Sequence, residues 1–393
     1  MRKVVLVAAK RTPIGSFMGS LSEIKATTLG AIVVKDLLTS IKLDPLEVDE
    51  VFMGHVLQAG TGQAPTRQVA INAGLPNTVP CTTINKVCAS GMKSIMLGVQ
   101  TIKLGDAEIV IAGGMESMSM SPHFVSIRKG KKFGELELKD TLQNDGLIDS
   151  FDQVAMGVFA DKCAKKYKIS REEQDNFAIE SYKRSFKAWE EGKFDDEIVS
   201  VKIKKGRENL IFDKDEEFRN VLIEKISNLK PSFSKDGTAT AANSSTINDG
   251  AAAVVLMSEE KALSLGIKPM AYLISQADAS VEPSSFTTAP SKALPIAIKK
   301  AGLRIDQIDY FEINEAFSVV GLANAKILGI DLNKMNINGG AVSLGHPIGC
   351  SGARIVVSLV HILQKNGLYG AAGICNGGGG ASAVIIKRYS EKS

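Results

Sequence analysis

The chain has 393 residues, of which 44% are hydrophobic and 23% are charged, a composition typical of globular proteins. Its formal net charge is only +4, and it contains no apolar run as long as a membrane span, so we expect neither nucleic acid nor a membrane as a partner. A chain of this length usually exceeds one compact core, which predicts two or more packed units.

The chain ends and the cysteines bear on location. Residues 1–17 mix basic and apolar residues but lack a long apolar stretch, which favours a buried strand over a signal peptide. The last residues are not a Ser-Lys-Leu peroxisomal ending. An odd number of scattered cysteines without a C-x-x-C pair argues against disulfides and structural zinc, and predicts a reduced, cytoplasmic protein. The cysteines are Cys81, Cys88, Cys163, Cys350 and Cys375.

The first segment alternates strand and helix patterns. Residues 3–9 and 108–114 are short, β-branched and apolar, as in buried strands. Between them, residues 90–105 place apolar side chains at helical spacing and end at Gly105, a usual helix stop. This alternation predicts βαβ units and an α/β fold with a mostly parallel sheet.

The composition changes between about residues 119 and 245. Residues 126–140 and 204–221 are polar and loop-like. Residues 170–194 have the pattern of an amphipathic helix, with a Ser-x-x-Glu capping start at Ser170. We interpret this region as a helical and looped insertion carried on the α/β body.

A second α/β segment follows the insertion and echoes the first. Residues 251–258 return to a strand pattern. Residues 84–114 resemble residues 337–378, because both run from a strand end through a small-residue turn with Ser-Gly into a helix, a glycine and a strand. The period is too long for a solenoid. The echo therefore predicts two duplicated halves, with the insertion inside the first.

The stretch "INKVCASGMKS" places Cys88 between a strand pattern and a helix start. A strand-to-helix turn exposes its central side chain, as nucleophile elbows do. Backbone N–H groups at a helix N-terminus favour negative charge and would stabilise a thiolate there. Cys88 is thus a candidate nucleophile, and a buried structural cysteine is the alternative.

The stretch "GGAVSLGHPIGCSG" places His346 in a glycine-rich loop held rigid by Pro347. A histidine in such a loop is a candidate general base for a thiol, and a histidine that caps backbone groups is the alternative. His55 and His123 lack such a setting, and His361 fits a packed helix residue.

The stretch "YFEINEAFS" places Asn314 and Glu315 after a strand pattern and before a helical one. Open α/β sheets bind ligands at the carboxyl ends of their strands. An amide there can hold a water or an oxyanion without titrating, while a helix N-cap by Asn314 is the alternative.

The stretch "ICNGGGG" adds a second thiol, Cys375, followed by backbone donors that a substrate can approach closely. It does not open a helix as G-x-G-x-x-G, and no G-K-[ST] follows, so dinucleotide and P-loop sites are excluded. The alternative is a small core cysteine beside a flexible turn.

These residues resemble the thiolase family over nearly the whole chain. "NKVCASGMKS", "NEAF", "NGGAVSLGHPIGCSGARI" and "ICNGGGGAS" are similar to the family's active-site signatures in order and spacing. "RTPIGSF", "GQAPTRQ", "GGMESMS" and "NDGAAA" are also similar. The likeness is greatest to the acetoacetyl-CoA thiolase (acetyl-CoA acetyltransferase) branch, especially its mitochondrial animal type.

The resemblance implies a reversible Claisen condensation of two acetyl-CoA to acetoacetyl-CoA and CoA. By this likeness Cys88 becomes acetylated, His346 takes its proton, and Cys375 removes the α-proton of the second acetyl-CoA. One oxyanion hole would be the N–H groups of Cys88 and Gly377, and the other would be His346 with a water held by Asn314. A thioester α-proton becomes removable only if the enolate is stabilised as it forms, so these groups fit the chemistry.

The fold implied is the thiolase fold, with two duplicated βαβαβαββ halves in a five-layered α-β-α-β-α arrangement and an inserted loop domain. The N-terminal half would span residues 1–118 and 246–268, the loop domain 119–245, and the C-terminal half 269–393. Arg128–Lys132 looks like the family's tetramerisation loop, which implies a homotetramer, and its basic residues could steer the CoA phosphates.

The resemblance also implies CoA as substrate and product, with no resident cofactor and no metal. The family's CoA contacts fall in the loop domain and next to "NEAF", and Arg219 aligns only across a one-residue gap. The matching positions are Met156, Arg219, Phe233, Ala241, Ser245, Ala316 and Phe317.

Three positions modify this expectation. Ala155 stands where acetoacetyl-CoA thiolases commonly carry a histidine near the pantetheine. Phe218 matches a tyrosine beside a potassium ion in mitochondrial animal members, so no potassium site is predicted. Phe286 matches a phenylalanine of those same members, which favours tolerance of 2-methyl substrates.

Other functions fit less well. Ala155 leaves open a broad-range 3-ketoacyl-CoA thiolase of fatty-acid β-oxidation. A non-catalytic acyl-CoA-binding relative would be expected to lack Cys88, His346 or Cys375, and all are present. A decarboxylating ketosynthase generally has a second histidine where this chain has Asn314.

Overall fold

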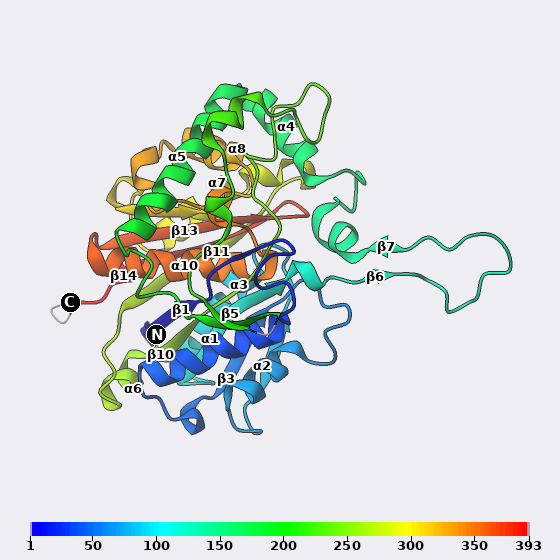
Figure 1. Cartoon of the computed structure of the whole chain (residues 1–393). Coiled ribbons are helices and arrows are strands. Elements are labelled where there is room, and N and C mark those ends of the chain that lie inside the picture. Colours follow the sequence, from blue (N-terminus) through cyan, green and yellow to red (C-terminus); the bar gives the residue numbers. More distant parts are fainter. Residues whose placement is uncertain (1, 207, 391–393) are drawn as a thin grey trace.

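The computed structural model describes residues 2–206 and 208–390 (Figure 1). Its main sheet has ten strands, and the path β12-β13-β14-β11-β1-β10-β5-β3-β4 is completed by β2, which pairs with β10. The two parts of this path meet at β1 and β11, which share only the pairs Val5–Tyr272 and Leu6–Ala271. The sheet is therefore divided at its middle into one part for each half of the chain.

The N-terminal half forms the β4–β3–β5–β10–β1 part of the sheet. β3 is parallel to β4 and β5, whereas β10 is antiparallel to β5 and β1. Its elements are β1 (Val4–Arg11), β2 (Gly15–Ser16), α1 (Ala26–Ser40), β3 (Glu50–Gly54), α2 (Pro65–Ala73), β4 (Cys81–Ile84), α3 (Ser90–Leu104), β5 (Ile109–Ser117), β10 (Asn248–Ser258) and α6 (Glu259–Ser264).

The C-terminal half repeats the same order of elements, which confirms the predicted duplication. β12 is parallel to β13, and β14 is antiparallel to β13 and β11. The counterpart of β4 is reduced to one bridge between Met335 and Phe311. The elements are β11 (Ala271–Ser280), α7 (Pro290–Lys300), β12 (Tyr310–Ile313), α8 (Ser318–Leu328), α9 (Ala341–Leu344), α10 (Ile348–Lys365), β13 (Tyr369–Asn376) and β14 (Gly380–Arg388).

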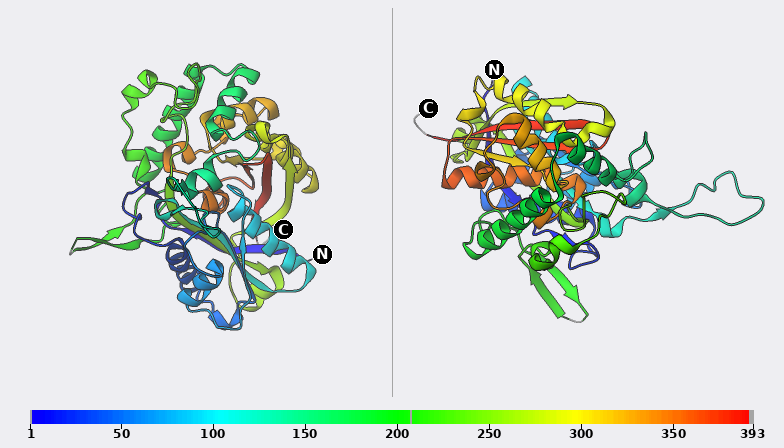
Figure 2. Two further views of the ribbon diagram at one scale, coloured as in Figure 1. Left: turned by 90° about the vertical axis from the view of Figure 1, so that its right-hand side faces the viewer. Right: turned by 90° about the horizontal axis from the view of Figure 1, so that it is seen from above.

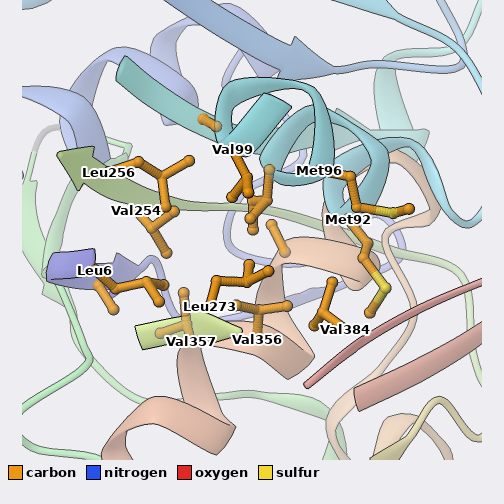
Figure 3. Close-up of a cluster of buried hydrophobic side chains, with 14 of the residues drawn as sticks. Leu6, Met92, Met96, Val99, Val254, Leu256, Leu273, Val356, Val357 and Val384 are labelled. Atoms are coloured by element: carbon orange, nitrogen blue, oxygen red, sulfur yellow. The ribbon is translucent and has the colours of Figure 1, made fainter. Parts of the chain in front are cut away.

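The helices α3 and α10 lie between the two parts of the sheet (Figures 1 and 3). Outer layers of α1 with α2, and of α7 with α8, cover the other faces, so the predicted five-layered arrangement is confirmed. The central cluster draws apolar side chains from both helices and from strands of both halves. Those labelled in Figure 3 are Leu6, Met92, Met96, Val99, Val254, Leu256, Leu273, Val356, Val357 and Val384.

The middle layer explains the sequence of α10. This helix is buried along nearly its whole length, which suits a near-continuous apolar pattern rather than a one-sided stripe. Its polar residues have internal partners. His361 Nε2 lies 2.9 Å from the carbonyl oxygen of Ala9, as expected for a packed helix residue, and Arg354 forms a buried ion pair with Glu312.

The inserted region packs against α8 of the C-terminal half and sends one loop far from the body (Figures 1 and 2). The helix predicted at Ser170 is present as α5, and Ser170 and Glu173 form the predicted capping box. The boundaries of the three domains stay predictions. The elements are β6 (His123–Phe124), β7 (Lys139–Asp140), η3 (Leu142–Leu147), α4 (Met156–Tyr167), α5 (Arg171–Glu190), β8 (Val201–Lys205) and β9 (Glu208–Phe212).

A buried ion cluster ties β1 to the inserted region. Arg11 is fully buried, its Nη1 lies 2.7 Å from Asp215 Oδ1, and its Nε contacts Glu197. Burial alone would lower the pKa of Arg11, but Asp215 and Glu197 raise it above its ordinary value.

Among the described helices, none combines the length and hydropathy that a membrane span requires.

We predict that Arg11→Met destabilises the fold by roughly 3–5 kcal/mol, because it leaves two buried carboxylates without their cation. The midpoint of urea unfolding measures the change. Lys187→Met is the control, since Lys187 is 74% exposed in its pair with Glu191 and should leave the midpoint nearly unchanged. Equal effects of the two substitutions would contradict this account of the Arg11 cluster.

Candidate active site

The predicted reacting side chains come from four segments that meet where the two halves face each other. Cys88 lies between β4 and α3, and His346 lies in the loop before α10. Asn314 follows β12 directly, and Cys375 is next to last in β13. Because β12 and β13 are parallel, Asn314 and Cys375 sit at the same edge of the sheet, where α/β folds place ligands.

A cavity of about 780 Å³ opens at this junction. Cys88, His346 and Gly377 line it. Asn314 and Cys375 are fully buried and do not line it, but Cys375 packs in one cluster with phenylalanines that do. The fold therefore brings the two predicted thiols, the imidazole and the glycine turn to one site.

The turn that carries Cys88 is strained. Val87 has a φ of +48°, in the left-handed region that a β-branched residue rarely adopts. Its N–H donates to Asn85 Oδ1 over 3.0 Å, and Ser90 Oγ donates to the Val87 carbonyl oxygen over 2.6 Å. Strain of this kind persists only where the surroundings hold it, and here it turns Cys88 to the cavity.

The protonation state of Cys88 differs from the expectation that a helix N-terminus would favour its thiolate. Burial raises the pKa of Cys88 to about 11, although backbone N–H groups of Gly377 and of Cys88 itself act in the opposite direction. Glu116 raises it further. Desolvation outweighs the local donors, so the resting group is a thiol that must lose its proton as it reacts. The same two N–H groups were predicted to form an oxyanion hole.

His346 combines one supported and one free ring nitrogen. Its Nδ1 lies 2.6 Å from Ser351 Oγ, which also lies 2.9 Å from the Pro347 carbonyl oxygen. The hydroxyl can accept from Nδ1–H while donating to Pro347, or donate to a bare Nδ1, so it serves either neutral tautomer. Nε2 is buried and makes no hydrogen bond among the described residues. It can accordingly accept a proton or donate one.

The charge of His346 is also set by its surroundings. Burial and the cation of Arg354 lower the pKa of His346 to about 3. The ring is therefore neutral at physiological pH in the empty site. Cys88 and His346 form a neutral pair rather than a preformed thiolate and imidazolium.

The side-chain amide of Asn314 is buried, and neither Oδ1 nor Nδ2 has a partner in the described part of the chain. Leaving a buried polar group unpaired costs about 1–3 kcal/mol, so the amide points to a bound polar group such as water. The N-cap alternative is wrong, because α8 begins only at Ser318 and its N-cap is Phe317. A buried amide without a protein partner agrees with the predicted water-holding role of Asn314.

The thiol of Cys375 is fully buried. Burial and the neighbouring Cys88 raise its pKa, and Cys163 raises it further. The effect of Cys88 indicates that the two thiols lie close together. In the resting site Cys375 is thus protonated.

The four glycines serve different purposes. A Cβ on Gly377 would meet only Val87 and Met156 side-chain atoms at ordinary contact distance. Gly379 has a φ of +86°, and a Cβ there would lie 2.3 Å from the Val281 carbonyl oxygen. Glycine is therefore required at position 379 because the protein's own backbone at Val281 lies too close for a side chain, and not because a substrate approaches there.

All the predicted CoA-binding residues except Arg219 line the cavity. Arg219 is exposed and its guanidinium carbon lies 5.3 Å from the centroid of the Phe218 ring. The rings of Phe233 and Phe317 meet edge to face with centroids 5.8 Å apart. The cavity-lining members of the predicted set are Met156, Phe233, Ala241, Ser245, Ala316 and Phe317.

Other lining residues were not singled out as contacts from the sequence. Phe17 ends the family-like stretch "RTPIGSF", and Asn220 stands in a segment that reads as loop. Leu147 ends the short helix η3, and Ile148 follows it. An apolar pair in an otherwise polar insertion was the only signal for Leu147 and Ile148. Glu116 and Ser351, which support the site, gave no signal beyond their family-like stretches.

Comparisons with known proteins agree with this geometry. A probable acetyl-CoA acetyltransferase of Dictyostelium discoideum is 53% identical over 99% of this chain and 94% of its own length. The mitochondrial acetyl-CoA acetyltransferase of Bos taurus is 53% identical over 99% of this chain and 92% of its own. The Acat5 thiolase of Ascaris suum, solved in complex with coenzyme A, superposes with a TM-score of 0.95 at 46% identity, covering 99% of this chain and all of that one.

Two family models complete the comparison. The thiolase N-terminal domain matches residues 4–260, and the thiolase C-terminal domain matches residues 267–388. Together they cover nearly the whole chain, as the four signature stretches predicted. The chain belongs to the thiolase family.

Proposed function

We propose that this protein is an acetyl-CoA C-acetyltransferase that joins two acetyl-CoA into acetoacetyl-CoA and CoA, reversibly, through an acetyl-cysteine. The observation that carries the proposal is the meeting of Cys88, the Gly377 N–H and the free Nε2 of His346 at one cavity. The names of the full-length relatives, among them the acetyl-CoA acetyltransferase of Saccharomyces cerevisiae at 52% identity, support this activity over the broader alternative.

In the first half-reaction, the sulfur of Cys88 attacks the thioester carbon while its proton moves to His346 Nε2. The N–H groups of Cys88 and Gly377 would stabilise the developing oxyanion. The bond to the CoA sulfur then breaks, and the departing thiolate takes the proton of Cys375. Cys88 is left acetylated, Cys375 is a thiolate, and His346 carries the proton.

In the second half-reaction, the Cys375 thiolate takes the α-proton of the second acetyl-CoA. The enolate oxygen would accept from His346 Nε2–H and from a water on the Asn314 amide. The enolate carbon attacks the acetyl carbon on Cys88, and the released sulfur regains its proton from His346. All protons are restored, and no resident cofactor or metal enters the proposed cycle.

Short acyl groups fit the reacting end of the cavity. A Cβ at Gly377 would lie 3.7 Å from Met156 Cε, so Met156 stands beside the predicted oxyanion hole. Phe286 is buried against Phe159, with ring centroids 6.3 Å apart, and lines the same cavity. These bulky side chains limit the space for a long acyl chain. Ala155, which also lines the cavity, is the feature that favours the broad-range alternative.

We predict that kcat/KM for thiolysis of acetoacetyl-CoA exceeds that for a medium-chain 3-ketoacyl-CoA by at least about tenfold. A substrate-length series in the thiolysis direction measures this ratio. Phe286→Ala should narrow it, because the substitution opens the acyl end. Preference of the unaltered protein for the longer chain would replace the proposal with the broad-range alternative.

Assembly and location belong to the proposal as well. We propose a homotetramer, because the loop between β6 and β7 stands away from the body and exposes apolar side chains, with Phe133 94% exposed (Figures 1 and 2). We propose a cytoplasmic location because all five cysteines are free thiols, as is usual in a reducing compartment. The alternative is a mitochondrial location, which is part of the name of the Bos taurus relative.

A further inference from the structure

In the proposed cycle a proton passes between Cys88, from the N-terminal half, and His346, from the C-terminal half. The distance between these two side chains must therefore stay constant. Between their two segments lies Glu116, a fully buried carboxylate on β5 that has no part in that cycle. We propose that Glu116 is a positioning residue that sets His346 against Cys88 by capping α10 from the other half of the molecule. The inference rests on the proposed roles of Cys88 and His346.

The carboxylate reaches the helix that follows His346. Glu116 Oε2 accepts from the backbone N–H of Gly349 over 3.0 Å. Gly349 is in the first turn of α10, and the N-cap residue Pro347 offers no side-chain cap of its own. A carboxylate at a helix N-terminus satisfies an otherwise unpaired N–H and interacts favourably with the helix dipole. Glu116 therefore fixes the first turn of α10 at Gly349, three residues after His346.

The same carboxylate reaches the segment beside the Cys88 turn. Glu116 accepts from the N–H groups of Val56 over 3.1 Å and Leu57 over 3.3 Å. The neighbouring His55 N–H donates to the Ile84 carbonyl oxygen over 3.0 Å, at the end of the strand that leads to Cys88. One side chain is thus bonded to the first turn of α10 and to residues 56–57, which the His55 backbone ties to the end of the strand that leads to Cys88.

The start of α10 approaches the carboxylate so closely that only glycine fits at position 349. A Cβ added at Gly349 would lie 2.7 Å from Glu116 Oε2 and 2.6 Å from the Met115 carbonyl oxygen. His55 Nε2 lies 3.2 Å from Glu116 Oε1, and His55 is itself 1% exposed. The carboxylate thus accepts from three backbone N–H groups and lies beside one imidazole.

Glu116 also acts on neighbouring ionisable groups by its charge. Its carboxylate raises the pKa of Cys88 on the elbow, of Asp249 on β10 and of Cys350 on α10, where in each case burial is the larger cause. The imidazole of His55, after β3, also faces this carboxylate. Removing the charge should therefore make Cys88 easier to ionise, even as it loosens the start of α10.

The decisive variant is Glu116→Gln. We expect kcat for thiolysis to fall on the order of 10²-fold, the scale of a misplaced reacting group, while KM for CoA stays within about twofold. The rate of Cys88 alkylation by iodoacetamide should rise, and its pH profile should move to lower pH. A residue that only stabilises the fold would lower both turnover and thiol reactivity or leave both unchanged.

Two further variants keep the test decisive. Glu116→Asp retains the charge but shortens the reach to Gly349, so turnover should fall while the alkylation profile stays in place; it decides the question if Glu116→Gln does not fold. Asp309→Asn is the matched control, because Asp309 accepts from the N–H groups of Leu368 and Tyr369 at the other end of β12 from Asn314. Turnover within twofold of the unaltered protein in both Glu116 variants, or an equal loss in Asp309→Asn, would overturn the proposal.

Discussion

Replacing Cys88 with alanine is expected to lower the rate of acetoacetyl-CoA thiolysis by at least about four orders of magnitude, because none of the other four cysteines lines the cavity to carry the acetyl intermediate. His346 and the N–H of Gly377 would remain in place but would have no sulfur to serve. Steady-state thiolysis with CoA as the second substrate measures the loss.

The control for that substitution is Cys81→Ala. Cys81 begins β4, the strand that leads to the Cys88 turn, but it does not line the cavity. Its removal should leave the rate within about twofold of the unaltered protein, as for an ordinary surface-proximal change. Thiolysis by Cys88→Ala at a rate near that of Cys81→Ala would show that the nucleophile has been assigned to the wrong residue.

Replacing Cys375 with alanine is expected to separate the two half-reactions. Acetylation of Cys88 should continue, because the CoA thiolate can leave without a proton from Cys375. Condensation should fall by roughly 10²–10⁴-fold, the usual contribution of a positioned acid or base. The two rates are measured by the release of free CoA in a single turnover and by acetoacetyl-CoA formation.

Cys163→Ala is the matched control, since Cys163 is also a buried thiol beside Cys375 but belongs to α4. It should leave both half-reactions nearly intact. Survival of condensation in Cys375→Ala would reduce the glycine stretch to a turn after a core cysteine. Loss of acetylation along with condensation would instead show that CoA cannot leave without the proton of Cys375.

Local features of the fold were predictable from the sequence. The capping start at Ser170, the helix stop at Gly105 and the near-continuous apolar pattern of α10 depend on neighbours within a few residues. The duplication was visible as well, because both halves keep the order of strand end, small-residue turn and helix.

The protonation state of Cys88 was not predictable in the same way. The helix N-terminus beside Cys88 suggested a favoured thiolate, but the pKa rises to about 11 because apolar side chains of α10 and of the inserted region pack against the partly buried thiol. Burial is a property of the assembled layers. The N-cap alternative for Asn314 was also wrong, because α8 starts only at Ser318 and its N-cap is Phe317.

Contacts between residues far apart in the chain were the least predictable feature. Nothing near Glu116 in the chain indicates that its carboxylate reaches Gly349, more than two hundred positions later. The same holds for Arg11, whose partners Glu197 and Asp215 lie in the inserted region. The structure brings the predicted site residues together, and their individual roles stay predictions.

The most direct test of the central claim is to identify the acetylated residue. The protein would be incubated with acetyl-CoA, quenched in acid and mapped by peptide mass spectrometry, with Cys375→Ala in parallel to trap the intermediate. The proposed mechanism predicts one acetyl group on the peptide that contains Cys88 in both samples. An acetyl group on the peptide of Cys375, or on none of the cysteine peptides, would contradict it.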